Sequence, residues 1–156
     1  MSPKLDISMT PDEVWAFLAP PRVGVLSSNG PDGYPHSAAM SYVPEDGALH
    51  MWTYAKSAKA RNLRRDSRCA FLVEDGELYH ELRGVLVRGE VEIDDDPAVV
   101  AAVGMGLRDR QKIDETDVVG APRAPEEVQA QAVKRIALVL RLDRVHSWDH
   151  GKIPRR

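Results

Sequence analysis

Three clusters of turn-forming residues divide the first half of the chain into short segments and constrain its fold most strongly. The clusters are Asn29–Gly33, Pro44–Gly47 and Glu74–Gly76. The segments between them are rich in β-branched, aromatic and small residues, the pattern of antiparallel hairpins. We therefore expect a small barrel of the mainly-β or α+β class. Its six predicted strands cover residues 23–27, 34–43, 48–54, 69–73, 78–93 and 136–142.

Short helices are expected to flank these strands. Thr10–Glu13 has the spacing of a capping box with proline at the first helical position, which predicts a helix over residues 11–19. A second helix should begin after Ser57 and a third after Asp96, ending near Arg110. Residues 112–125 are predicted to form a loop, and Pro125 could open a short fourth helix. The tail, residues 143–156, carries Trp148 outside any expected element.

Within the strands, the alternation over residues 48–54 places Leu49, Met51 and Thr53 on one face and His50, Trp52 and Tyr54 on the other. Gly84 and Gly89 are candidates for bulges where a barrel bends.

The length of 156 residues suits a single domain spanning residues 1–156. With 43% hydrophobic and 29% charged residues, the composition is that of a soluble globular protein. No apolar run approaches the roughly 20 residues that a membrane span requires, and no secretion signal is apparent, so we expect a cytoplasmic protein without a membrane partner. Cys69 is the only cysteine and is expected to be a buried core residue.

Positive charge is concentrated after the strand over residues 48–54, although the chain has a formal net charge of -3. Lys56, Lys59 and Arg61 surround Ser57, which can cap a helix and leave its first N–H groups facing an anion. The segment is therefore a candidate phosphate site, and a solvated basic helix face is the alternative. Nucleic-acid binding is not expected, because the total charge is acidic and no aromatic platform accompanies the helix.

A metal site is also not expected. His146 and His150 have the i, i+4 spacing of a helical zinc pair, but no third ligand is evident. The acidic run Asp94–Asp96 is better explained by the dipole at a helix N-terminus.

Four motifs in order carry a family resemblance: Arg22-Val-Gly-Val-Leu26, Pro31-Asp-Gly-Tyr-Pro-His36, the basic segment Lys56 to Arg68, and Ser147-Trp-Asp-His150. Together they resemble the pyridoxamine 5'-phosphate oxidase-like split β-barrel family. Within that family they are most similar to the actinobacterial flavin/deazaflavin oxidoreductase branch that uses coenzyme F420. The arginine-rich C-terminal substrate signature of a true pyridoxine-phosphate oxidase is missing, so vitamin B6 oxidation is not expected.

The resemblance implies a six-stranded split β-barrel that forms a homodimer with cofactor sites at the interface. The phosphate of F420, or alternatively FMN, would be held by Lys56, Ser57, Lys59 and Arg61. The tricyclic ring would lie along His36, Ser37, Ala38, Ala39, Met40 and Ser41. Tyr79 and His80 would reach the cofactor of the partner subunit.

The activity implied by the resemblance is hydride transfer between the reduced cofactor and an unsaturated or oxidised small molecule. No side-chain nucleophile is needed, and the proton could come from Tyr54, Tyr79, His36 or water. The alternatives are an FMN-dependent oxidoreductase of the same fold, or a non-catalytic carrier or sensor of flavin, F420 or haem.

Overall fold

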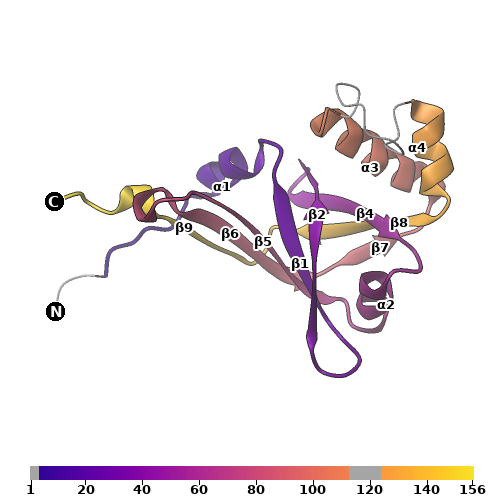
Figure 1. Ribbon diagram of the computed structural model, residues 1–156, viewed down its shortest axis with the longest axis horizontal. Coiled ribbons are helices and arrows are strands. Elements are labelled where there is room, and N and C mark those ends of the chain that lie inside the picture. Colours follow the sequence, from indigo (N-terminus) through magenta and orange to yellow (C-terminus); the bar gives the residue numbers. More distant parts are fainter. Residues whose placement is uncertain (1–3, 113–123) are drawn as a thin grey trace.

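The computed structural model describes residues 4–112 and 124–156, which form two antiparallel sheets (Figure 1). The five-stranded sheet has the order β2-β1-β5-β6-β9 and contains β1 (Val23–Asn29), β2 (Pro35–Ser41), β5 (Arg68–Asp75), β6 (Arg83–Glu90) and β9 (Val145–Asp149). The four-stranded sheet has the order β3-β4-β8-β7 and contains β3 (Val43–Glu45), β4 (Ala48–Tyr54), β7 (Glu92–Asp94) and β8 (Arg135–Arg141).

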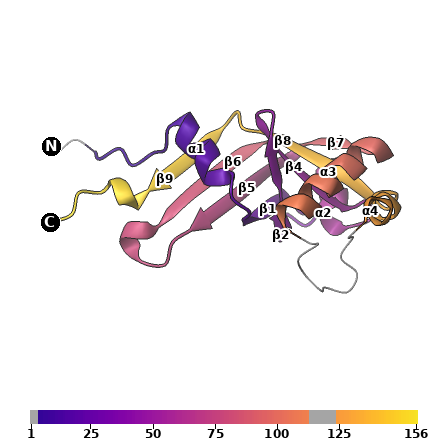
Figure 2. The same ribbon diagram turned by 90° about the horizontal axis from the view of Figure 1, so that it is seen from above.

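Four α-helices flank the sheets in the described part of the chain: α1 (Pro11–Leu18), α2 (Ala58–Arg65), α3 (Pro97–Arg110) and α4 (Pro125–Ala132). Two short 3-10 helices, η1 (Tyr79–Glu81) and η3 (His150–Lys152), follow β5 and β9. Helices α3 and α4 pack beside β4 and β8 at one end of the molecule, and both termini lie at the other end (Figures 1 and 2). No described helix is long and apolar enough to cross a membrane.

The chain crosses four times between the sheets. Strand β2 passes into β3 through Tyr42, β4 leads to β5 through α2, β6 passes into β7 through Val91, and β8 leads to β9 through residues 142–144. The predicted split barrel of the mainly-β, α+β class is therefore confirmed, as two sheets that share the chain. The predicted single strands over residues 34–43 and 78–93 are wrong, because each changes sheets partway. Residues 79–81 also form η1 in place of a strand.

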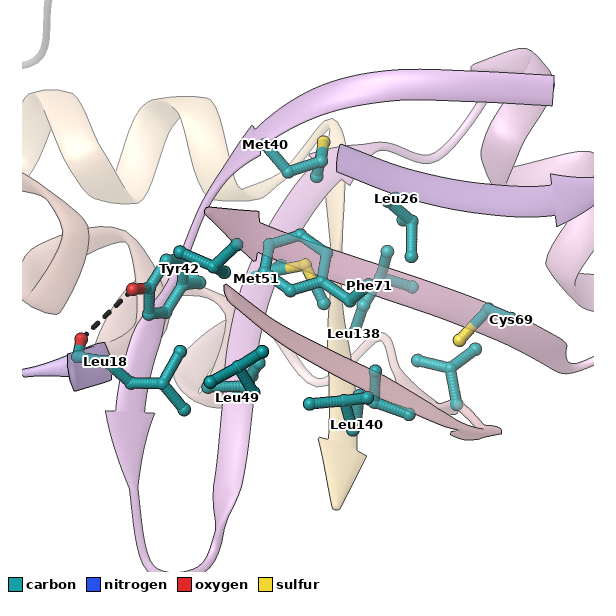
Figure 3. Packing of buried hydrophobic residues seen from close by; sticks show 14 of the residues in the cluster. Leu18, Leu26, Met40, Tyr42, Leu49, Met51, Cys69, Phe71, Leu138 and Leu140 are labelled. Atoms are coloured by element: carbon teal, nitrogen blue, oxygen red, sulfur yellow. Dashed lines mark hydrogen bonds between the residues drawn. The ribbon is translucent and has the colours of Figure 1, made fainter. Parts of the chain in front are cut away.

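The main core lies between the two sheets (Figure 3). Phe71 and Tyr42 are fully buried there, with ring centroids 5.6 Å apart and an edge-on orientation. The predicted alternation in β4 is confirmed, because Leu49, Met51 and Thr53 are all buried. The Tyr42 hydroxyl donates a hydrogen bond to the carbonyl oxygen of Leu18, at 3.0 Å. The buried phenol O–H therefore has a partner.

Helix α1 is fixed at both ends. The predicted capping box is confirmed, with Thr10 and Glu13 each accepting a hydrogen bond from the other's backbone N–H. At the other end, the Arg110 guanidinium donates to the carbonyl oxygens of Leu18 and Pro20, both at 2.7 Å. The carbonyls at the end of a helix have no intrahelical donors, and Arg110 supplies donors here, in addition to the Tyr42 hydroxyl that already donates to Leu18. Arg110 thereby ties the end of α3 to α1.

An ion cluster connects β1 to the far end of the β5–β6 pair. Asp75 accepts hydrogen bonds from Arg83 at 2.8 and 2.9 Å and from Arg22 at 2.7 Å. The hydrogen bonds from Arg83, with a further contribution from Arg22, lower the pKa of Asp75 below its usual value. Both guanidinium groups also lie over the Phe17 ring of α1, 4.3 and 5.2 Å from its centroid. Arg22 thus has a structural role.

The predicted irregular tail is wrong for its first part, since residues 145–149 form β9. Trp148 pairs with Gly84 of β6, and its ring occupies the space that a side chain at position 84 would need. The predicted bulges at Gly84 and Gly89 are also wrong, because the β5–β6 register is continuous through both residues.

The predicted loop over 112–125 falls mostly on residues 113–123, outside the described part of the chain. The helix predicted to open at Pro125 is confirmed.

Candidate functional site

The basic segment folds as predicted, as a strand, a turn and a helix. Ser57 has the extended backbone of an N-cap, and its Oγ accepts a hydrogen bond from the Ala60 amide at 3.2 Å. Thr53 Oγ1, at the end of β4, lies 3.3 Å from Ser57 Oγ and anchors the cap to the sheet. The amides of Ala58 and Lys59 have no acceptor in the described part of the chain. The start of α2 is therefore open to an anion.

The cations of this segment are not equivalent. Arg61 donates to the carbonyl oxygen of Lys56 at 2.7 Å and so stabilises the turn. Arg65 donates to Asn29 and Asn62. Lys56 and Lys59 form no ion pair in the part of the chain that the structure describes. These two ammonium groups beside an open helix N-terminus suit the charge of a phosphate.

The predicted ring segment, residues 36–41, is the edge strand β2 of the five-stranded sheet. Its first residue, His36, pairs with Ser28 of β1, whose hydroxyl accepts a hydrogen bond from Asn62 of α2 at 3.3 Å. His36 Nδ1 is buried and has no hydrogen-bond partner among the described residues. The start of β2 and helix α2 are thus linked through β1. The intervening Ser37 and Ala38 leave this strand with little side-chain bulk, although Ser37 Oγ lies 3.0 Å from Ser27 Oγ.

The other end of β2 opens onto a pocket of about 310 Å³. The predicted residues Ala39, Met40 and Ser41 line one side of it. The opposite side comes from β4, α3, α4 and β8, through Trp52, Gly104, Leu107, Arg108, Gln111, Gln131 and Arg135. Trp52 is in the same strand that leads into the basic segment, so β4 connects this pocket to the start of α2. We call the pocket and the basic segment together the candidate site.

Two predicted residues do not join the candidate site within one chain. Tyr79 and His80 lie in η1, at the end of the molecule where the termini lie, whereas α2 is at the other end (Figures 1 and 2). Tyr79 is 71% exposed, and its carbonyl oxygen lies 2.7 Å from His150 Nδ1. The helical spacing of His146 and His150 is not realised, because they lie in β9 and η3.

Cys69 lies in the core as predicted. Burial raises the pKa of its thiol to about 11, so the thiolate nucleophile is scarce at neutral pH. Cys69 also borders a larger cavity, of about 640 Å³, whose other lining residues carry charges of both signs. No predicted site residue lines this cavity.

Sequence reasoning missed the arginines of the candidate site. Arg135 lies over the rings of both Trp52 and Tyr54, with its guanidinium carbon 4.5 and 4.1 Å from the two centroids. The alternation of β4 predicts that both rings lie on one face, but it does not predict that Arg135 lies over them. That contact depends on the pairing of Tyr54 with Arg135, which the structure shows.

Two antiparallel sheets between which the chain passes repeatedly define the class of this protein as a split barrel. The chain belongs to the pyridoxamine 5'-phosphate oxidase family, whose model matches residues 10–149. Comparison with curated proteins gave no match.

Solved structures agree with the family. A conserved hypothetical protein, Rv2991, from Mycobacterium tuberculosis is 37% identical, with a TM-score of 0.82, over 100% of this chain and 96% of that one. An F420 reductase is 27% identical, with a TM-score of 0.66, over 85% of this chain and 94% of that one. HutZ, a haem storage protein from Vibrio cholerae, is 14% identical with a TM-score of 0.63, over 88% of this chain and 94% of that one, and shares the fold.

Proposed function

We propose that this chain is an oxidoreductase that uses F420 to reduce an unsaturated or oxidised small molecule. The observation that carries the proposal is the open start of α2 with two cations, Lys56 and Lys59, that form no ion pair with any described residue. The likeness to an F420 reductase over most of the chain supports the choice of F420. FMN is the alternative cofactor, because the same anion site suits its phosphate.

The residues of the candidate site would divide the work. Lys56, Ser57, Lys59 and Arg61 would hold the cofactor phosphate, and residues 36–41 would lie along its ring. The bound cofactor supplies the hydride-transfer chemistry. Met40, Trp52 and Leu107 would give the pocket an apolar wall that excludes water from the reacting groups.

Titration of the cofactor-stripped protein with F420 and with FMN in parallel, followed by ligand fluorescence, tests this proposal. F420 should bind more tightly than FMN, and Lys59→Ala should weaken F420 binding about tenfold or more through loss of a charge-assisted contact. Arg64→Ala is the matched control, because Arg64 is exposed on the same helix near its opposite end. A preference for FMN would move the protein to the flavin-dependent alternative. Binding of neither ligand would refute the cofactor assignment.

We also propose that the chain acts as a homodimer. On the outer face of the five-stranded sheet, Val23 is 59% exposed and Val25 is 40% exposed. The strand register places Ala39 and Leu72 beside Val25, and Leu86 beside Leu72, on the same face. Apolar side chains gathered in this way favour association with another surface. A second copy seated there would also offer a position from which the partner's Tyr79 and His80 could approach the candidate site.

Val25→Arg should shift the protein from dimer to monomer, because a guanidinium at the centre of the apolar face would lose its hydration on association. Sedimentation velocity measures the change. Asp12→Arg, at an exposed and already charged position of helix α1 and not of the sheet face, should leave the sedimentation coefficient unchanged. A wild-type chain that sediments as a monomer at all concentrations would contradict the proposal.

A further inference from the structure

The 310 Å³ pocket differs from the larger cavity in its charge. Two arginines, Arg108 and Arg135, line the smaller pocket, and none of the lining residues in the described part of the chain is an aspartate or glutamate. The 640 Å³ cavity is lined by four arginines together with three acidic residues, so its charges nearly cancel. Arg108 pairs with Asp109 at 3.0 Å, which leaves the positive charge of the smaller pocket on Arg135.

Arg135 is held in a fixed orientation. It stacks on Trp52 and Tyr54, and its Nη1 donates to the carbonyl oxygen of Gln131 at 3.1 Å. No carboxylate pairs with Arg135 in the part of the chain that the structure describes. Stacking orders the planar group while leaving its edge free to donate, which suits it to bind a carboxylate in bidentate fashion.

The remainder of the pocket suits a flat apolar group. The Trp52 ring, Leu107 and Met40 supply apolar surface beside the arginine. Gly104 lets helix α3 pack directly against the Trp52 ring, because a Cβ at that position would lie 2.4 Å from the ring. The volume is at the lower end of the range for small-molecule pockets.

We propose that Arg135 binds the carboxylate of the small-molecule substrate and that the pocket selects unsaturated or aromatic carboxylates. This inference rests on the proposed function, since it assigns the substrate end of the same site. A substrate carboxylate and a cofactor phosphate both match the guanidinium of Arg135, so the experiment distinguishes these two anions. Arg135 is a specificity residue in this proposal, and the cofactor phosphate stays at the start of α2.

The test uses cinnamate and cinnamamide, two planar probes of equal size that differ in charge. Ligand-observed NMR titrations of the full chain should show cinnamate binding about tenfold more tightly than cinnamamide. Arg135→Gln should remove this preference, and Arg135→Lys should restore part of it because the charge returns without the stacked fork. Arg141→Gln is the matched control, because Arg141 lies at the other end of β8, 3.5 Å from Glu92, and should keep the full preference.

Parallel F420 titrations separate this proposal from the proposed function. The expected result is that Arg135→Gln binds F420 as the wild type does while losing the cinnamate preference. An F420 affinity that falls in Arg135→Gln while the cinnamate preference persists would overturn the proposal and assign the arginine to a cofactor anion. Equal binding of cinnamate and cinnamamide by the wild type would also overturn the proposal for Arg135. That result would not bear on the binding of F420 through Lys59.

Discussion

Replacing Phe71 by alanine is expected to lower the free energy of unfolding by about 3–5 kcal/mol. Phe71 is fully buried between the sheets, where it meets the edge of Tyr42 and packs against Gly24. A Cβ at position 24 would lie 2.3 Å from the Phe71 ring, so the backbone of β1 approaches the ring too closely to leave room for a methyl group. Removal of the ring would therefore leave a cavity bounded by strands that cannot easily close it.

Equilibrium unfolding in urea, monitored by circular dichroism, measures this loss. Phe71→Leu is the control, since it keeps most of the buried volume and should lose less than half as much. A loss below about 1 kcal/mol for Phe71→Ala would mean that the core relaxes around the missing ring, against the close packing described above.

The second large effect is expected at Gly84. A Cβ there would lie 2.1 Å from the Trp148 ring, so Gly84→Ala should displace the tryptophan and cost about 1–3 kcal/mol. Gly89→Ala in the same strand is the control. Its nearest neighbour would be the flexible end of Leu140 at 3.3 Å, so its cost should be well under 1 kcal/mol.

A double-mutant cycle identifies the cause of the Gly84 effect. If the steric conflict with Trp148 is responsible, Gly84→Ala should cost much less in a Trp148→Ala background. Thermal or urea unfolding of the four proteins gives the coupling energy. An unchanged cost in that background would show that the backbone, and not the indole, disfavours the side chain.

Local signals predicted the elements that depend on neighbouring residues. The helix start at Thr10, the cap at Ser57 and the alternation of β4 all use groups within a few positions of each other, so the sequence displays them directly. The strand–turn–helix part of the candidate site was predictable for the same reason.

The missed features depend on residues far apart in the sequence. Strand β9 is short, and its Trp148 ring packs against β6 because residue 84 has no side chain. The chain passes from one sheet to the other at Tyr42 and at Val91, and these positions depend on which distant strand pairs with each neighbouring segment. The alternating side-chain pattern continues through both residues, so it does not mark the change of sheet. Arg135 joins the candidate site only through its register with Tyr54 in β4.

The four crossings of the chain between the two sheets bear on how the molecule folds. The strands on either side of Tyr42 and Val91 are separated by a single residue, so neither sheet contains a complete set of strands that could separate from the other. Partial opening would have to pull β3 or β7 away while β2 or β6 stayed paired, exposing the buried residue at the crossing to solvent. We therefore expect the barrel to unfold as one cooperative unit, so that β2 and β4 of the candidate site open only together with the core between the sheets.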